Sequence, residues 1–210
     1  MEHFADISLA DFAKRLSEKV PAPGGGAVAA VTLAHSAALG AMVLRYTVGR
    51  TDFAKHEADN LATLHALDGT RVTALLLADR DAAAYAKLSS LWKLPASDPV
   101  RKRDFDAALH EAIAAPSDLV KLALRTAQSL SSLPLRTNPR LGSDLVIAAS
   151  LAAVAADAAA WNVRVNISSL TDAAQSQSIR MHTDADVHKA RTFAEQVAAA
   201  VQHAGSNASS

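Results

Sequence analysis

Apolar residues recur every three or four positions along most of this chain, and this spacing places them on one face of an α-helix. The stripe is clearest in the middle of the sequence, where its members are Leu61, Leu64, Leu67, Val72, Leu75, Leu76 and Leu88. It predicts a helix that begins near Thr51 or Asp52 and ends near Trp92.

Capping residues predict where the preceding helices begin and end. Ser8 and Asp11 form a capping pair for a short first helix, which we expect to reach about Val20. The glycines at 24–26 open a second helix, which should end just before Gly49 because a glycine is typical of that position.

Prolines divide the second half of the chain. Ser97 or Asp98 is the expected N-cap of a helix whose first residue is Pro99. Pro116 should kink or restart this helix, and Pro134 should begin a loop.

The last two helices are predicted from polar residues before apolar stripes. Ser143 is the expected cap of a helix that reaches about Leu170, and Thr171 with Asp172 should begin a final helix that fades near His203. Long helices joined by short turns predict an all-α fold, an antiparallel bundle.

Composition supports one alanine-rich domain. Hydrophobic residues make up 50% of the chain but aromatic residues only 4%, which favours closely packed helices over a sheet. We expect a single domain over residues 1–203 and a disordered tail over 204–210. Elongated helices of this kind often pack their remaining apolar stripe against a second copy, so we expect a homodimer.

The charges exclude some partners. The chain has 21 basic and 21 acidic residues, so no overall field attracts nucleic acid or an anionic membrane. It lacks cysteine and begins without the features of a signal peptide, so we expect a cytoplasmic protein. The apolar run Ala27–Val48 has the length of a membrane span, but Thr32, His35 and Arg45 interrupt it and favour a buried helix.

The segment Pro21–Gly26 is the most unusual local feature. Its three glycines expose backbone N–H groups at a helix N-terminus, where the helix dipole favours anions and electron-rich atoms. A ligand could approach closely because no side chain is in the way. The alternative is that the glycines only allow two helices to touch.

Four carboxylates lie among alanines and are candidates for proton transfer, since loss of hydration raises a carboxyl pKa. They are Asp79, Asp81, Asp144 and Asp157. Asp79 and Asp81 point about 200° apart around a helix, so one of them should be solvated, whereas Asp81 shares a face with Tyr85. Asp144 follows the predicted Ser143 cap, and stabilisation by the helix dipole explains it without catalysis.

Other polar residues are less specific. Asn162 and Asn166 share a helix face and need partners in the core, in a second subunit or in a ligand. Arg50 could meet a ligand carboxylate, although scattered basic side chains are usually solvated. The histidines do not cluster, so we expect no metal site.

Several motifs together resemble the tetrahydrofolate cyclodeaminase/cyclohydrolase family over almost the whole chain. They are PAPGGGAVAA, YTVGRTDF, DRDAAAYAKLSSLWKLP, AAPSDLVKLAL, TNPRLGSDL and WNVRVN. The resemblance implies a dimer of helical subunits with folate sites at the interface. It further implies Asp81 as the preferred acid/base and Asp144 as a second catalytic candidate. The substrate-binding positions that it implies are Gly24, Gly25, Gly26, Arg50, Asn138, Ser143, Asn162 and Asn166.

The family pattern is not followed everywhere. Ala27 replaces a polar residue after the glycines, Ala83 replaces a glutamate, and Thr137 replaces a glycine. Thr51 and Asp52 stand where basic residues are usual, which weakens attraction to a polyglutamate tail.

The resemblance implies ring chemistry at the one-carbon unit that bridges N5 and N10 of tetrahydrofolate, with no cofactor. We predict a methenyltetrahydrofolate cyclohydrolase that forms 10-formyltetrahydrofolate. The alternatives are a formiminotetrahydrofolate cyclodeaminase that releases ammonia, and a non-catalytic helical dimer that binds a folate-like ligand or another protein.

Overall fold

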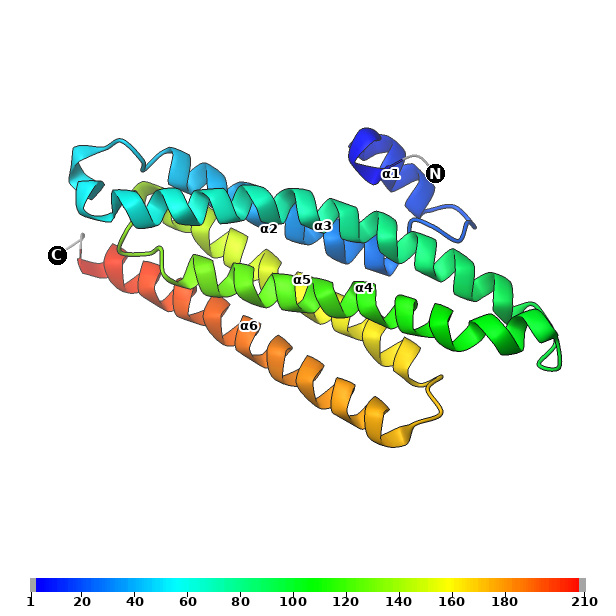
Figure 1. Cartoon of the computed structure of the whole chain (residues 1–210). Coiled ribbons are helices and arrows are strands. Elements are labelled where there is room, and N and C mark those ends of the chain that lie inside the picture. Colours follow the sequence, from blue (N-terminus) through cyan, green and yellow to red (C-terminus); the bar gives the residue numbers. More distant parts are fainter. Residues whose placement is uncertain (1–2, 208–210) are drawn as a thin grey trace.

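The computed structural model describes residues 3–207, and these residues form helices with no strand (Figure 1). The elements are η1 (Phe4–Asp6), α1 (Leu9–Leu16), α2 (Gly25–Arg45), η2 (Thr51–His56), α3 (Glu57–Trp92), α4 (Pro99–Ser131), η3 (Pro139–Leu141), α5 (Gly142–Ile167) and α6 (Ala173–Asn207). The predicted all-α bundle is therefore confirmed for this part of the chain.

The five long helices pack in two layers, and each runs antiparallel to the one before it. In one layer α4 lies between α3 and α6, and in the other α2 lies beside α5 (Figure 1). Helix α5 contacts α2, α4 and α6, so it is the centre of the bundle. Among residues 3–207, no long helix packs on the outer sides of α2 and α5.

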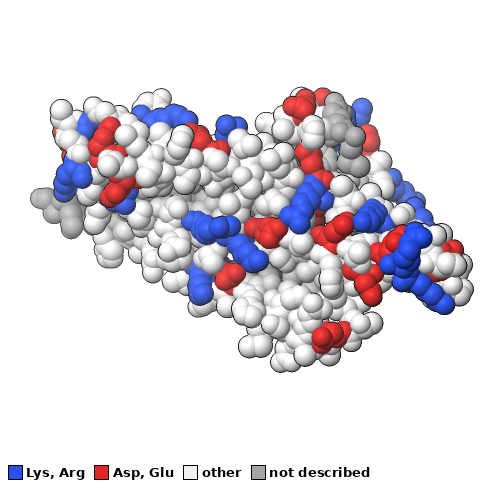
Figure 2. Space-filling view, in the orientation of Figure 1, with Lys and Arg blue, Asp and Glu red and all other residues white. Residues whose placement is uncertain are grey.

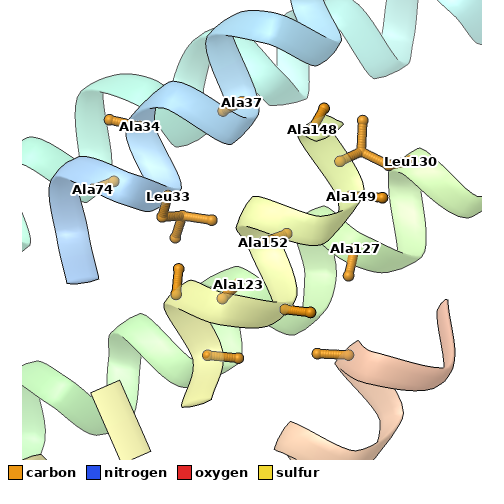
Figure 3. Packing of buried hydrophobic residues seen from close by; sticks show 14 of the residues in the cluster. Leu33, Ala34, Ala37, Ala74, Ala123, Ala127, Leu130, Ala148, Ala149 and Ala152 are labelled. Carbon is orange, nitrogen blue, oxygen red and sulfur yellow. The ribbon is translucent and has the colours of Figure 1, made fainter. Parts of the chain in front are cut away.

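The core is built mainly from alanine, as the composition predicts. Figure 3 shows Ala148, Ala149 and Ala152 of α5 among small residues of α2 and α4. Such short side chains let helix backbones approach closely enough for direct bonds between helices. The buried Ser36 hydroxyl of α2 donates a hydrogen bond to the carbonyl of Ala148 at 2.7 Å.

The predicted break at Pro116 is wrong, because α4 continues through this proline from Pro99 to Ser131. Proline has no N–H, so it cannot donate to the carbonyl of Ala112 one turn earlier. Asn166 of α5 supplies the missing donor, with its Nδ2 atom 2.7 Å from that carbonyl oxygen. An interhelix bond thus stabilises the helix where the sequence predicted an interruption.

Several predicted caps are confirmed. The Ser8 hydroxyl accepts a hydrogen bond from the Asp11 N–H, and Asp98 accepts from the first turn of α4. Asp172 accepts from the N–H groups of Ala174 and Gln175 at the start of α6.

Other predicted boundaries are wrong. α1 ends at Leu16 rather than near residue 20, and α3 begins at Glu57 after the short helix η2. Ser143 is not a cap but the second residue of α5, because η3 leads directly into that helix. α6 continues to Asn207, past the predicted end near His203, and positions 208–210 of the predicted tail lie outside the described residues.

Two helical segments of the described chain are long and apolar enough to cross a membrane by length and composition alone. They are α2 and the segment Pro139–Ile167. Core helices of a bundle pass the same test, and α2 and α5 form the inner contacts described above. The packing agrees with the buried-helix interpretation of the sequence.

Candidate active site

A cavity of about 250 Å³ opens where α2 begins. α2 is much shorter than α3, so its N-terminus lies part-way along α3 and leaves space beside it. The walls are the segment before α2, the glycines of its first turn, one face of α3, and Asn162 of α5. The triple glycine, Asp81 and Asn162, which are far apart in the sequence, therefore meet at one place.

Gly26 lets the Asp81 carboxyl group lie directly against the backbone of α2. A Cβ atom at position 26 would stand 2.5 Å from Cγ of Asp81 and closer still to Oδ2. Any side chain at this buried position would therefore displace the carboxyl group. The glycines form part of the cavity itself and are more than a point of contact between helices.

The first turn of α2 also presents backbone donors. Its N-cap is Gly24, which has no side chain to accept a hydrogen bond from the first N–H groups. These groups and the helix dipole favour an electron-rich ligand atom at this end of the helix.

Burial raises the pKa of Asp81 from 3.8 to about 6, because the ionised carboxylate loses hydration. No lysine, arginine or histidine is among the described residues that line the cavity. A carboxyl group with this pKa exchanges its proton readily near neutral pH, which suits it to general acid/base catalysis.

Tyr85 and Asn162 complete the walls. Tyr85 lies one helical turn after Asp81 and is the aromatic member of the lining, with 45% of its surface exposed. Asn162 donates from Nδ2 to the carbonyl of Ala158 at 3.1 Å, and no described protein group is bonded to its Oδ1. Oδ1 lies near Gly25, where an added Cβ would be 3.8 Å away. The cavity thus offers an aromatic ring with its hydroxyl, an amide oxygen and a carboxyl group.

Asn138 and Ser143 lie at the other end of the bundle. They line a separate cavity of about 480 Å³, and Asn138 caps η3 by accepting from the Arg140 N–H. Asp144 is also at this end, and it precedes Asn162 by eighteen positions of α5, or about 27 Å. Within one chain these three predicted site residues are not brought to Asp81.

Two other predicted substrate contacts have different partners. Arg50 forms an ion pair of 3.0 Å with Asp52 beyond the C-terminus of α2, far from the glycines. Asn166 is bonded to Ala112 and is not part of the cavity lining. Within one chain, α2 and α5 therefore hold these two residues away from Asp81.

The remaining acidic candidates also have other partners. Asp157 forms an ion pair of 2.8 Å with Arg191 of α6. Asp79 is only 21% exposed and binds the N-terminal segment, so the expectation that one of Asp79 and Asp81 is solvated is wrong. In the part of the chain that the structure describes, no three His, Cys, Asp or Glu side chains are grouped to hold a metal ion.

Pro21 and Ala22 are walls of the cavity that the sequence did not predict. Their position next to the glycines was a signal, but nothing in the sequence shows that they lie beside α3. The role of Asp79 in holding the N-terminal segment was not predicted either, since that contact spans 76 positions.

The bundle and this cavity define a class of protein, an all-α bundle that holds a largely buried carboxyl group at a glycine-opened helix end. Residues 8–185 match the Formiminotransferase-cyclodeaminase family, and the chain belongs to that family.

Two relatives of known name match most of this chain. The chain is 31% identical to formimidoyltransferase-cyclodeaminase of Sus scrofa, with 90% of this chain and 36% of that protein covered. It therefore spans about a third of the length of this relative. It is 29% identical to methenyltetrahydrofolate cyclohydrolase of Methylorubrum extorquens, with 80% of this chain and 82% of that protein covered.

One solved structure is similar to this chain along nearly the full length of both proteins. The crystal structure of formiminotetrahydrofolate cyclodeaminase from Thermotoga maritima matches with a TM-score of 0.87 and 25% identity. The match covers 95% of this chain and 98% of that one.

Proposed function

We propose that this chain is a folate one-carbon enzyme, a methenyltetrahydrofolate cyclohydrolase, in which Asp81 transfers the protons. The observation that carries the proposal is the Asp81 carboxyl group held against Gly26, with a pKa of about 6, in a cavity without a counter-ion among its described walls. The named relatives supply the substrate class.

The reaction requires only water and proton transfer. The ionised Asp81 takes a proton from water as the water oxygen bonds to the methenyl carbon. The carboxylic acid then gives a proton to N5 as the bond between N5 and that carbon breaks. The formyl group remains on N10, and one proton is released because the methenyl substrate is a cation. The reaction balances without a redox cofactor or a metal.

The same group serves the second candidate, the cyclodeaminase. In that reaction N10 attacks the formimino carbon and the nitrogen that leaves is protonated, so ammonia departs. The specific support is the Thermotoga cyclodeaminase, which this chain matches over 98% of its length.

We further propose that the active form is a homodimer that pairs across α5. The exposed apolar residues of α5 lie on one stripe, which comprises Ile147, Val154, Trp161 and Val165. This stripe has no long helix over it in one chain, and such faces are typical of subunit interfaces.

A two-fold axis through Val154 would complete the site. Ile147 and Trp161 are each seven positions from Val154, so in an antiparallel pair Ile147 of one copy would meet Trp161 of the other. The same register would place Ser143 and Asp144 of the second copy near the Asn162 end of the first. The dimer would thus unite predicted site residues that one chain holds about 27 Å apart.

The experiment follows the absorbance of methenyltetrahydrofolate with and without the protein, and separately measures ammonia from formiminotetrahydrofolate. Loss of absorbance above background without ammonia release from the second substrate supports the cyclohydrolase. Ammonia release supports the cyclodeaminase. No turnover of either substrate would contradict both and favour the non-catalytic dimer.

A further inference from the structure

The N-terminal arm, residues 3–24, lies on the surface of the bundle and stands out at the upper right of Figure 2. Figure 1 shows α1 standing apart from the long helices, and no residue of α1 is buried. Phe4 and Phe12 hold the arm together by an edge-to-face contact, with ring centroids 5.8 Å apart. Both rings are partly buried against the main core.

Asp79 of α3 binds the start of the arm with both carboxyl oxygens. Its Oδ2 lies 2.8 Å from Nδ1 of His3, and its Oδ1 accepts a hydrogen bond of 3.0 Å from the N–H of Phe4. Asp79 is only 21% exposed, so these donors replace water that the carboxylate has lost.

The other end of the arm is a wall of the cavity. Pro21, Ala22 and Gly24 line it together with Asp81. Asp79 and Asp81 are two positions apart and point to nearly opposite sides of α3. The arm therefore extends from one side of α3 to the side that carries the reactive carboxyl group.

Hydrogen bonds connect α1 to the residues just before the wall. The N–H of Ser17 donates to the carbonyls of Ala13 and Lys14, the N–H of Glu18 donates to Arg15, and the N–H of Val20 donates to Glu18. We therefore expect a shift of α1 to move residues 17–20, which lead directly into the wall.

We propose that Asp79 is a positioning residue that fixes the cavity wall at residues 21–24 by anchoring the N-terminal arm. The effect on turnover rests on the proposed function, whereas the effect on the wall does not. With the anchor in place, the wall confines substrate against Asp81 and Tyr85. Without it, the arm opens more often and substrate is held less tightly.

The test compares Asp79→Ala with Asp68→Ala in the full chain. Asp68 is also on α3 and forms an ion pair of 2.7 Å with Arg45, but it touches neither the arm nor the cavity lining, so it is a matched control. Asp79→Ala removes both acceptors, whereas Asp79→Asn keeps an oxygen for the Phe4 N–H and should restore part of the effect.

Hydrogen exchange and kinetics give two independent readouts. Loss of two bonds to a carboxylate should speed amide exchange in α1 and residues 17–20 about 10-fold, with no change in α5. For a turning-over enzyme KM should rise about 5-fold to 10-fold while kcat stays within about 2-fold, because binding is weakened and the acid/base group remains. Asp68→Ala should show neither change.

A thiol placed in the wall decides the proposal even if the protein turns over neither folate substrate, because the natural chain has no cysteine. Faster alkylation of Ala22→Cys in the Asp79→Ala background supports it. Alkylation at the rate seen in the Asp68→Ala background would overturn it. In an active enzyme, an unchanged KM with a faster-exchanging arm would also overturn it, because the wall would then not confine substrate.

Discussion

The carboxyl group of Asp81 occupies the space that a side chain at Gly26 would fill. The glycine-rich N-terminus of α2 and the Asp81 carboxyl group thus share one small cavity. No basic side chain is among the described residues that line this cavity. The close approach removes water from Asp81, and this burial raises its pKa to about 6. The glycine and the acid therefore act as one unit.

Gly26→Ala should reduce turnover at least 10-fold, because the new methyl group would displace the carboxyl group from its position. The measurement is kcat/KM with the substrate identified by the assays above. Gly69→Ala is the matched control, since an added Cβ there meets nothing within 4 Å and position 69 is also helical. Equal activity in the two variants would show that Gly26 does not position Asp81.

The pH dependence of turnover should follow Asp81. The cyclohydrolase reaction begins with the ionised carboxylate, so kcat/KM should fall about 10-fold per pH unit below the pKa of about 6. A profile that stays flat down to about pH 5 would mean that another group takes the proton.

Asp81→Asn should make the protein more stable near pH 8. The pKa of Asp81 is higher in the folded chain than its ordinary 3.8, so the protonated form is favoured by folding. Ionisation therefore lowers stability as pH rises from about 4 to about 6, and the cost persists above that range. The partly open cavity reduces it to about 1–3 kcal/mol, or a rise in Tm of several degrees in the variant.

Thermal unfolding at two pH values tests this cost. The advantage of Asp81→Asn should shrink near pH 4, where the carboxyl group is protonated in the folded chain. An advantage that is absent at about pH 8, or equal at both values, would contradict a raised pKa.

Asn166→Ala should lower the free energy of unfolding by about 1–3 kcal/mol, because the Ala112 carbonyl loses its donor. In a Pro116→Ala background the same change should cost less, since the backbone N–H at 116 can then bond to that carbonyl. Denaturant unfolding of the four proteins measures the coupling. Strictly additive effects would mean that Asn166 does not compensate for the proline.

Val154→Asp should produce a monomer with reduced activity if subunits pair across α5. Val154 is 57% exposed in one chain, so the charge costs little there but would be buried beside its symmetry mate in the dimer. Sedimentation velocity measures the state, with Val100→Asp as a control because that valine is exposed on α4. A Val154→Asp dimer would exclude this interface.

Local sequence signals predicted much of the fold. Helical spacing and the caps at Ser8, Asp98 and Asp172 act within one or two turns, so they can be recognised without knowledge of the packing. The predicted break at Pro116 was wrong because the donor that replaces the proline's missing N–H is Asn166, fifty positions later on another helix.

The site was predicted in part, where motifs and the order of the helices were sufficient. The glycines, Asp81 and Asn162 do meet, and their pairing follows from the antiparallel order of α2, α3 and α5. The predicted helix from Ser143 to about Leu170 already placed Asn138 and Asn162 at opposite ends, although the family motifs group them in one site. The sequence could not show that Asp79 binds Phe4, because that contact spans 75 positions.

The most direct test of the proton-transfer role is the rate of methenyltetrahydrofolate hydrolysis by Asp81→Asn beside the unaltered protein, with helical content checked by circular dichroism. We predict a loss of at least about 100-fold in kcat with the helical content unchanged. A variant that folds and retains most of the turnover would contradict the assignment of Asp81 as the acid/base group.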